Sequence, residues 1–336
     1  MRAFVTGATG LLGSNLVTAL LSAGYEVKGL VRSLDKARRV FPNGEIEFVT
    51  GDMSDVGGFA PALKGCDVLF HTAAYFREYY QPGDHQSILE KINVQGTVDL
   101  LLAAEKNALR KAIHVSSAGV IGMKPDGSPG DENTLPDEHS TANLYFSSKV
   151  SAELAISRFL KERTLPVAMV LPGWMWGPGD WAPTGSGQLV LDFLAGKLPG
   201  IIDGGASTVD ARDVAQACVA AVERGHSGER YIVGGHFFDF AGIFAILEKV
   251  TGVPAPRRRI PYPVMVAVAA VSQTWSRITG NSSLITVEAV KTMHSRRSVL
   301  SEKSIRELNV AFRPFEDTVR DEVAWFRSQP RNPEHK

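Results

Sequence analysis

The chain has 336 residues, enough to bury a large core and more than one average domain requires, so we expect a main body and a smaller second lobe. Its 36 basic and 36 acidic residues cancel to a formal net charge of zero, which gives no reason to expect nucleic acid or an acidic lipid as a partner. The two cysteines, Cys66 and Cys218, match neither a disulfide framework nor a metal site, so we expect no metal.

The first predicted elements are a strand, a glycine-rich turn and a helix. A short apolar strand over residues 3–6 runs into three glycines at three-residue spacing. Gly7 permits a tight turn, Gly10 lets the backbone approach a pyrophosphate, and Gly13 lets the following helix pack closely on the strand. Because the strand aims the helix N-terminus at the anion, the pattern predicts a dinucleotide-binding βαβ unit.

Short runs rich in Val, Ile, Leu or Phe then alternate with helical patterns through the first half of the chain. The predicted strands cover residues 3–6, 26–31, 46–50, 68–71, 112–116 and 167–171, and the first helix covers 14–23. This alternation is typical of an α/β fold with a Rossmann-type, doubly wound parallel sheet. We therefore expect residues 1–172 to form a nucleotide-binding domain.

A cluster of Trp, Pro and Gly between residues 173 and 187 marks a loop and a change of lobe. We expect residues 173–330 to form a smaller, mixed α/β and mainly substrate-binding lobe, with some segments returning to the first domain, and residues 331–336 to form a tail. The predicted elements of this half are a helix over 188–195, a strand near Ile201, a helix from Asp210, a strand over 230–233 and helices up to Arg327.

The most apolar run of the chain extends from Val264 to Val271. It is far shorter than the roughly 20 residues that a membrane-spanning helix needs, so we expect no stable membrane insertion. We predict a buried helix of the second lobe here, with a role at a membrane surface as the alternative. Because the chain opens directly on a predicted strand, with no room for a signal peptide, we expect a cytoplasmic protein.

Tyr145 and Lys149 lie four residues apart in a predicted helix, so the phenol and the ammonium share one face. A free tyrosine, with a pKa of about 10, is a poor acid or base at neutral pH, but a nearby cation stabilises the phenolate. Taken alone, the pair could equally lie on a solvated helix face. However, the strand over 112–116 leads into Ser117 at the carboxyl edge of the sheet, where ligands bind in this architecture, and a serine there can bind a substrate carbonyl.

These motifs, in this order, resemble those of the extended short-chain dehydrogenases/reductases, the NAD-dependent epimerase/dehydratase family. The segment from Thr6 to Gly13 resembles that family's phosphate-binding fingerprint, and Ser117, Tyr145 and Lys149 match its catalytic triad, with Ser116 as the alternative serine. Within the family, the chain most resembles the dihydroflavonol-4-reductase-like branch, which includes bacterial proteins described as hopanoid-associated sugar epimerases.

The resemblance implies hydride transfer and roles for further residues. A substrate carbonyl would lie against Ser117 and Tyr145, Tyr145 would donate the proton, and Lys149 would hold the nicotinamide ribose. Asp52 resembles the carboxylate that holds the adenine, and Asn93 resembles the helix asparagine that steadies the active site and counts among the catalytic residues. A helix cap for Asp52 and a structural amide for Asn93 remain the alternatives.

The end of the second strand indicates which cofactor binds. An NAD-preferring site places Asp or Glu there, whose carboxylate binds the ribose 2′-hydroxyl and repels a 2′-phosphate. This chain has Val31 followed by Arg32, so we expect NADP(H), with NAD less favoured; the alternative is that Arg32 is only a surface charge. The full expected cofactor site is Gly7, Thr9, Gly10, Leu11, Leu12, Gly13, Arg32, Ser33, Lys36, Asp52, Met53, Thr72, Ala73, Ala74, Ser116, Tyr145, Lys149, Pro172, Gly173 and Trp174.

Aromatic residues gather in two segments expected at the same sheet edge. We expect Tyr75, Tyr79, Trp174 and Trp176 to line the substrate pocket, although each alone could be a core residue. Nucleotide-sugar members of the family commonly carry an arginine shortly before the helix at Asp210, and this chain has none there. An arginine elsewhere could replace it; the candidates are Arg212, Arg257, Arg258 and Arg259.

Three functions are therefore open. The first is an NADP(H)-dependent carbonyl reductase or alcohol dehydrogenase for a small, fairly apolar molecule, which the aromatic segments favour. The second is a sugar or nucleotide-sugar epimerase, and the third is a non-catalytic NADP(H) sensor, although such proteins usually lose the tyrosine and the lysine. The family also commonly dimerises through helices that here cover 86–106 and 145–162; Leu101, Leu102, Ala152 and Ile156 permit a homodimer, but could simply face the sheet.

Overall fold

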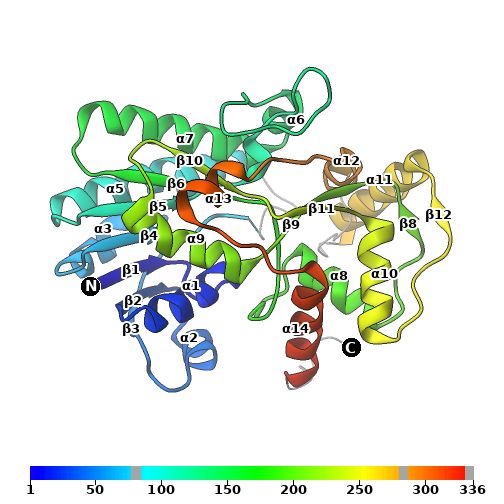
Figure 1. Ribbon diagram of the computed structural model, residues 1–336, viewed down its shortest axis with the longest axis horizontal. Helices are drawn as coiled ribbons and strands as arrows, with labels where there is room; N and C mark the ends of the chain where they lie inside the picture. The colour runs from blue at the N-terminus through cyan, green and yellow to red at the C-terminus, as the bar shows by residue number, and fades with distance from the viewer. Residues whose placement is uncertain (77–84, 280–286, 330–336) are drawn as a thin grey trace.

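The main sheet has seven parallel strands in the order β10-β6-β5-β4-β1-β2-β3 (Figure 1). The computed structural model describes residues 1–76, 85–279 and 287–329. The predicted α/β, doubly wound fold is confirmed, and each of the six strands predicted in the first half is present. The strands of this sheet are β1 (Arg2–Thr6), β2 (Glu26–Val31), β3 (Glu47–Thr50), β4 (Val68–His71), β5 (Lys111–Val115), β6 (Val167–Pro172) and β10 (Arg230–Val233).

Helices cover both faces of this sheet, which is why its central strands are apolar at nearly every position. Alternate residues of one strand enter two different cores: Val5 packs among the helices of one face, and Phe4 among those of the other. The first face carries α1 (Leu11–Ser22), α2 (Leu34–Val40), α9 (Ala211–Arg224) and α13 (Glu302–Leu308). The second carries α3 (Val56–Phe59), η1 (Ala60–Leu63), α4 (Gln86–Leu89), η3 (Glu90–Gln95), α5 (Gly96–Lys106), η4 (Ala118–Val120) and α7 (Leu144–Glu162), and α6 (Glu138–Ala142) packs at the start of α7.

A second, smaller lobe packs beside the carboxyl end of the sheet, on the right in Figure 1. Its core contains Trp176, Phe240 and Phe315. Part of the later chain returns to the main body, since β10 pairs with β6 from Arg230↔Met169 to Val233↔Pro172. The lobe contains β7 (Trp174–Trp176), α8 (Gly185–Leu194), β8 (Ile201–Ile202), β9 (Gly205–Asp210), β11 (His236–Asp239), α10 (Phe240–Thr251), β12 (Arg259–Ile260), α11 (Tyr262–Thr279), α12 (Val287–His294) and α14 (Phe315–Ser328).

One expectation about this lobe is wrong. The apolar run predicted as a buried helix forms the first half of α11, but Val264, Val268 and Val271 are 49%, 47% and 70% exposed, and only Ala269 among its residues is buried. Apolar composition cannot distinguish a buried helix from one whose apolar stripe is left uncovered, since both have the same pattern. In the described part of the chain, no helix combines the length and apolarity required to cross a bilayer.

The positions considered for a dimer are mostly used within the chain itself. Leu101 and Ile156 are fully buried in the core against the sheet, as the alternative proposed; Ala152 is also fully buried, and Leu102 is half-buried. None of the three buried side chains can form part of an outer face of α5 or α7.

Two positions of the glycine loop after β1 require glycine, each for a different reason. Gly7 has a φ of +70°, and a Cβ there would meet the backbone nitrogen of Ala73 at 2.9 Å. A Cβ on Gly13 would stand 2.0 Å from the carbonyl oxygen of Gly7, so only glycine lets α1 pack on β1 at this distance. A Cβ on Gly10, in contrast, would meet only the Gly7 carbonyl, at an ordinary 3.4 Å. The fold therefore requires glycine at positions 7 and 13, and not at 10.

This difference predicts the effect of adding one methyl group at each site. Gly13→Ala should lower the free energy of unfolding by about 3 kcal/mol or more, because backbone must move to accept the Cβ. Gly10→Ala should change it by less than about 1 kcal/mol. Chemical denaturation of the two variants beside the natural chain measures both values, and equal losses would contradict the packing described here.

Candidate functional site

The ends of β1 and β4 are held together beside the glycine loop. Thr72 Oγ1 donates to the Thr6 carbonyl oxygen at 2.7 Å, and the backbone nitrogen of Ala73 donates to Thr6 Oγ1 at 3.2 Å. These bonds hold the segment after β4 in place. Its residues Thr72, Ala73 and Ala74 were predicted to lie beside a cofactor. The same bonds also explain why the backbone of Ala73 lies against Gly7.

The start of α1 is shaped to hold an anion. Gly10 is the N-cap and is exposed, its nitrogen donates to the Gly7 carbonyl oxygen at 3.0 Å, and no acidic side chain lies in the first turn. Amides in the first turn of a helix have no intrahelical acceptor and carry the partial positive charge of the helix N-terminus, which suits phosphate. Leu11 and Leu12 are buried, so their side chains support the loop. The space that a Cβ on Gly10 would enter is where the pyrophosphate is predicted to lie.

Asp52 and Arg32 lie close enough to influence each other beyond the ends of β2 and β3. Asp52 Oδ1 accepts a hydrogen bond from the backbone nitrogen of Ser54 at 2.8 Å. Burial alone would raise the pKa of Asp52, but the bonds from Ser54 and the charges of Arg32 and Lys91 lower it below the ordinary value. Asp52 thus already caps a local turn, and it lies near the exposed Arg32.

Further residues of the predicted cofactor site are partly used by the fold itself. Ser33 is the N-cap of α2, and its Oγ accepts from the backbone nitrogen of Lys36 at 3.2 Å, so Ser33 has a structural role. Lys36 is half-buried on the first turn of that helix, and Thr9 is half-buried in the glycine loop. Met53 is buried, and its carbonyl oxygen would stand 2.8 Å from a Cβ on Gly96.

Lys149 carries its positive charge on a buried side chain. Its side chain is only 3% exposed, and its Nζ donates to the Val115 carbonyl oxygen at 3.0 Å, at the end of β5. The same nitrogen lies 5.9 Å from the ring centre of Tyr145, one turn earlier on α7. Burial lowers the pKa of Lys149 from 10.5 to about 8, against the opposing effect of the Glu153 carboxylate. The ammonium is therefore charged at neutral pH and close to the point at which it can lose its proton.

Ser117 is held at the same place by the turn that follows β5. Its Oγ accepts a hydrogen bond from the backbone nitrogen of Gly119 at 3.1 Å, which orients the hydroxyl without using its proton. A Cβ on Gly119 would stand 2.2 Å from the Phe146 ring, so glycine lets this turn approach α7 closely. Asn143 caps α7 by accepting from the backbone nitrogen of Phe146 at 3.0 Å, and Tyr145 therefore lies in the first turn.

A half-buried acid behind Lys149 was missed by sequence reasoning. Glu153, one turn after Lys149, has a side chain only 12% exposed; it accepts a hydrogen bond from Ser116 Oγ and pairs with Arg230, Nε to Oε2, at 3.2 Å. Burial raises the pKa of Glu153, while Arg230, Ser116 and Lys149 lower it in part. The four-residue spacing from Lys149 could have indicated Glu153, but the strand that supplies Arg230 comes late in the chain.

Two histidines lie side by side beneath this site. The rings of His71 and His114 are 5.1 Å apart, and both side chains are buried. The His71 ring nitrogens contact the hydroxyls of Thr6 and Thr97 at 2.8 and 2.9 Å, whereas neither ring nitrogen of His114 has a hydrogen-bond partner among the described residues. Burial, reinforced by the charge of Lys149, lowers the pKa of His71 to about 3, and that of His114 well below 6.5. Both histidines are therefore neutral beside the Lys149 ammonium.

Asn93 is placed by a π-helical turn, η3, and is 3% exposed. Its Nδ2 donates to Ser148 Oγ at 3.0 Å, and its Oδ1 accepts from the backbone nitrogen of Tyr75 at 2.8 Å. Asn93 thus ties the segment after β4 to the helix that carries Tyr145. Extra residues in a helical turn often mark functional sites, and here the turn directs an amide inward.

The predicted aromatic residues lie in different surroundings. Tyr75 Oη contacts His85 Nδ1 at 2.8 Å. The ring of the next residue, Phe76, lies 4.7 Å from that of Tyr145. Trp174 is half-buried, 4.9 Å from Trp176, while Trp176 is fully buried and packs edge-on to a phenylalanine of α14 in the core of the second lobe. Tyr79 lies outside the described residues.

The segment after β6 passes close to two backbone carbonyls. A Cβ on Gly173 would stand 2.6 Å from the Gly234 oxygen and 2.7 Å from the Ser207 oxygen. Pro172, the last residue of β6, is buried, and its strand pairs with β5 from Ala112↔Val167 to Val115↔Val170. The structure therefore brings the segments carrying Ser116, Ser117 and Gly173 to neighbouring strand ends.

The chain is similar to known proteins over most of its length. Residues 3–234 match the model of the NAD dependent epimerase/dehydratase family. A Synechocystis protein named "Putative dihydroflavonol 4-reductase" is 31% identical over 97% of this chain and 94% of its own. "Sterol demethylase protein B" of Methylococcus capsulatus is 31% identical over 98% of this chain and 99% of its own.

A solved structure extends the similarity to three dimensions. The crystal structure of gox2253 superposes with a TM-score of 0.82 at 35% sequence identity, over 97% of this chain and 98% of that one. The family model spans more than half of the chain, and these relatives are similar over nearly its full length. Together they establish the family. The chain belongs to the NAD dependent epimerase/dehydratase family, among the extended short-chain dehydrogenases/reductases, whose members use NAD(P).

Proposed function

We propose that the protein is an NADP(H)-dependent reductase or alcohol dehydrogenase that acts on a small, fairly apolar carbonyl or hydroxy compound. The observation that carries the proposal is the buried Lys149, hydrogen-bonded to the end of β5 and one turn from Tyr145, with Ser117 on the turn that follows the same strand. A buried cation next to a phenol is costly unless it is used, because burial disfavours its charge. This argues against the non-catalytic sensor.

In this proposal the residues predicted for the cofactor site bind different parts of NADP(H). The exposed Gly10 and the first amides of α1 would hold the pyrophosphate, and Asp52 would face the adenine. When bound, the nicotinamide supplies or accepts a hydride. Tyr145 would hold the proton that is exchanged with the substrate oxygen, and Ser117 Oγ would donate a hydrogen bond to that oxygen. Lys149 lowers the cost of the phenolate because its positive charge is close and poorly screened.

Two observations on charge support an apolar substrate over a nucleotide sugar. Arg212 is bound by Asp210 and by Asp321, both at 2.7 Å, and Arg257 is bound by Glu248 at 2.8 Å. These are two of the arginines that could have replaced the missing diphosphate-binding cation. The names of the relatives in Synechocystis and Methylococcus refer to a dihydroflavonol and a sterol, and we extend only their apolar, multi-ring character to this chain.

We further propose that residues 1–172 bind the cofactor and that most of 173–330 forms the substrate side, with Tyr75 and Trp174 as walls. Trp176 is left out of this pocket, because its ring is fully buried in the core of the second lobe. Asn93 acts as a positioning residue here, since its amide holds the Tyr75 segment and α7 together.

Replacing the phenol tests the reaction. Tyr145→Phe should lower kcat for NADPH-dependent reduction of aromatic and aliphatic carbonyls by about a hundredfold or more, because the proton donor is lost, while NADPH still binds. Absorbance of the reduced cofactor measures the rate, and Tyr262→Phe, on α11, is the matched control. If no carbonyl is turned over, and the purified protein retains cofactor and binds a sugar nucleotide, the epimerase replaces this proposal.

Replacing the glycine of the cradle tests cofactor binding separately. Gly10→Ala should weaken NADPH binding by about tenfold or more, because its Cβ occupies the space proposed for pyrophosphate. Fluorescence titration measures the dissociation constant. Unchanged affinity in this stable variant would place the cofactor elsewhere.

The charge of Arg32 determines the cofactor preference in this proposal. Arg32→Gln should weaken NADPH binding by about tenfold and leave NADH binding nearly unchanged, because a charge-assisted bond to the 2′-phosphate is lost. Titration with both cofactors gives the ratio, and Arg39→Gln, exposed at the end of the short helix α2 that follows Arg32, is the control. Equal effects on both cofactors would refute the assignment of NADP(H).

Glu153 should determine the alkaline limit of the reaction. Its negative charge raises the pKa of Lys149, which burial holds at about 8, while His71 and His114 are neutral and Arg230 is paired. Glu153→Gln removes that charge, so Lys149 should lose its proton at lower pH and the alkaline limb of kcat/KM should move to lower pH. Profiles of this variant and of Glu162→Gln, an exposed acid on the same helix, test this; an unmoved limb would refute the coupling.

A further inference from the structure

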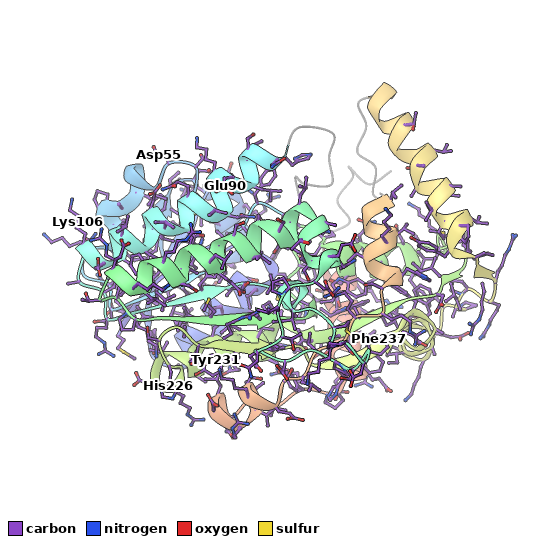
Figure 2. All side chains as sticks on the ribbon, turned by 90° about the horizontal axis from the view of Figure 1, so that it is seen from above. Asp55, Glu90, Lys106, His226, Tyr231 and Phe237 are labelled. Carbon is purple, nitrogen blue, oxygen red and sulfur yellow. The ribbon has the colours of Figure 1, made fainter. Side chains whose placement is uncertain are left out.

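Helix α11 presents an uncovered apolar stripe. Val264, Val268 and Val271 are 49%, 47% and 70% exposed, and their spacing of four and three residues places them on one face. The opposite face fixes the helix to the lobe: Ala269 is fully buried, and the Tyr262 ring stacks on that of His294 at 4.1 Å. In Figure 2 this yellow helix rises at the edge of the molecule, beyond the rest of the ribbon.

The sequence around this stripe is strongly basic, in contrast to the neutral chain. Arg257, Arg258 and Arg259 are consecutive and exposed, and only two residues separate them from the start of α11. From residue 255 to residue 300 the sequence has one acid, Glu288, but it has these basic residues: Arg257, Arg258, Arg259, Arg277, Lys291, Arg296 and Arg297. Three of the arginines are paired with acids from other segments, Arg257 with Glu248, Arg296 with Asp203 and Arg297 with Asp137.

We propose that α11 and the exposed Arg257–Arg259 run form a docking surface for an anionic lipid bilayer. A helix with an apolar face and basic residues beside it lies in the headgroup region, where the apolar side chains enter the acyl boundary and the cations meet anionic headgroups. The guanidinium charges specify the partner, because an apolar stripe alone would fit a protein surface equally well. Docking of this kind does not require a spanning helix, and it is independent of the reaction proposed above.

Vesicle sedimentation of the full chain tests the surface. The protein should bind vesicles of phosphatidylcholine with phosphatidylglycerol, bind those of phosphatidylcholine alone much less, and release as salt is raised. Replacing all three arginines, Arg257→Gln, Arg258→Gln and Arg259→Gln, should weaken binding about tenfold or more. The matched control is Arg158→Gln with Lys161→Gln, two exposed cations on α7.

The valines are tested in the same assay. Val264→Gln, Val268→Gln and Val271→Gln together should also weaken binding about tenfold or more, whereas Leu154→Gln with Ile305→Gln, exposed apolar residues of other helices, should not. All these positions are exposed, so thermal unfolding should be unchanged and reports whether each variant is folded. Three results would overturn the proposal: no binding to either vesicle, binding equal in all variants, or a dimer by light scattering that the valine variant alone dissociates without any vesicle binding.

Discussion

The contact between α7 and the end of β5 is the constraint on which the site depends. Lys149 reaches the Val115 carbonyl oxygen, and one turn later Glu153 accepts the Ser116 hydroxyl, so two polar bonds fasten the helix to consecutive residues of one strand end. Arg230, from the sheet-edge strand β10, closes the network on Glu153. Each ion is costly to bury alone, and the bonds that compensate for this cost also determine where Tyr145 and Ser117 lie.

Most of the main body could be predicted because its physical signals are local. The central strands are buried on both faces, so they appear as short apolar runs. Gly13 is forced by a contact with Gly7 within the same βαβ unit, and Gly7 is favoured locally by its positive φ. Tyr145 and Lys149 could likewise be paired from helical spacing alone. Glu153 shares that spacing, yet its partner Arg230 lies on β10, and no local pattern connects them.

The second lobe was harder to predict for the same reason. β7 is three residues of a segment rich in Trp, Pro and Gly, and it becomes a strand only by pairing with β9, from Trp174↔Thr208 to Trp176↔Asp210. β9 in turn pairs with β11, from His236↔Thr208 to Asp239↔Gly205, across more than one intervening element. The exposure of α11 is a similar case, since a sequence shows which face of a helix is apolar but not whether anything covers it.

The ion pairs near the second lobe bear on the substrate proposed above. Arg297 bonds Asp137 and the Ile121 carbonyl oxygen, and although burial opposes it, this guanidinium helps to lower the pKa of Asp137 to about 2. Arg212 is fixed in the same manner by Asp210, whose side chain is fully buried. Withdrawing either guanidinium to bind a diphosphate would leave a buried or half-buried carboxylate without its cation, at a cost of several kcal/mol. An uncharged substrate imposes no such cost, and for this reason these ion pairs support the proposal of an apolar substrate over a nucleotide sugar.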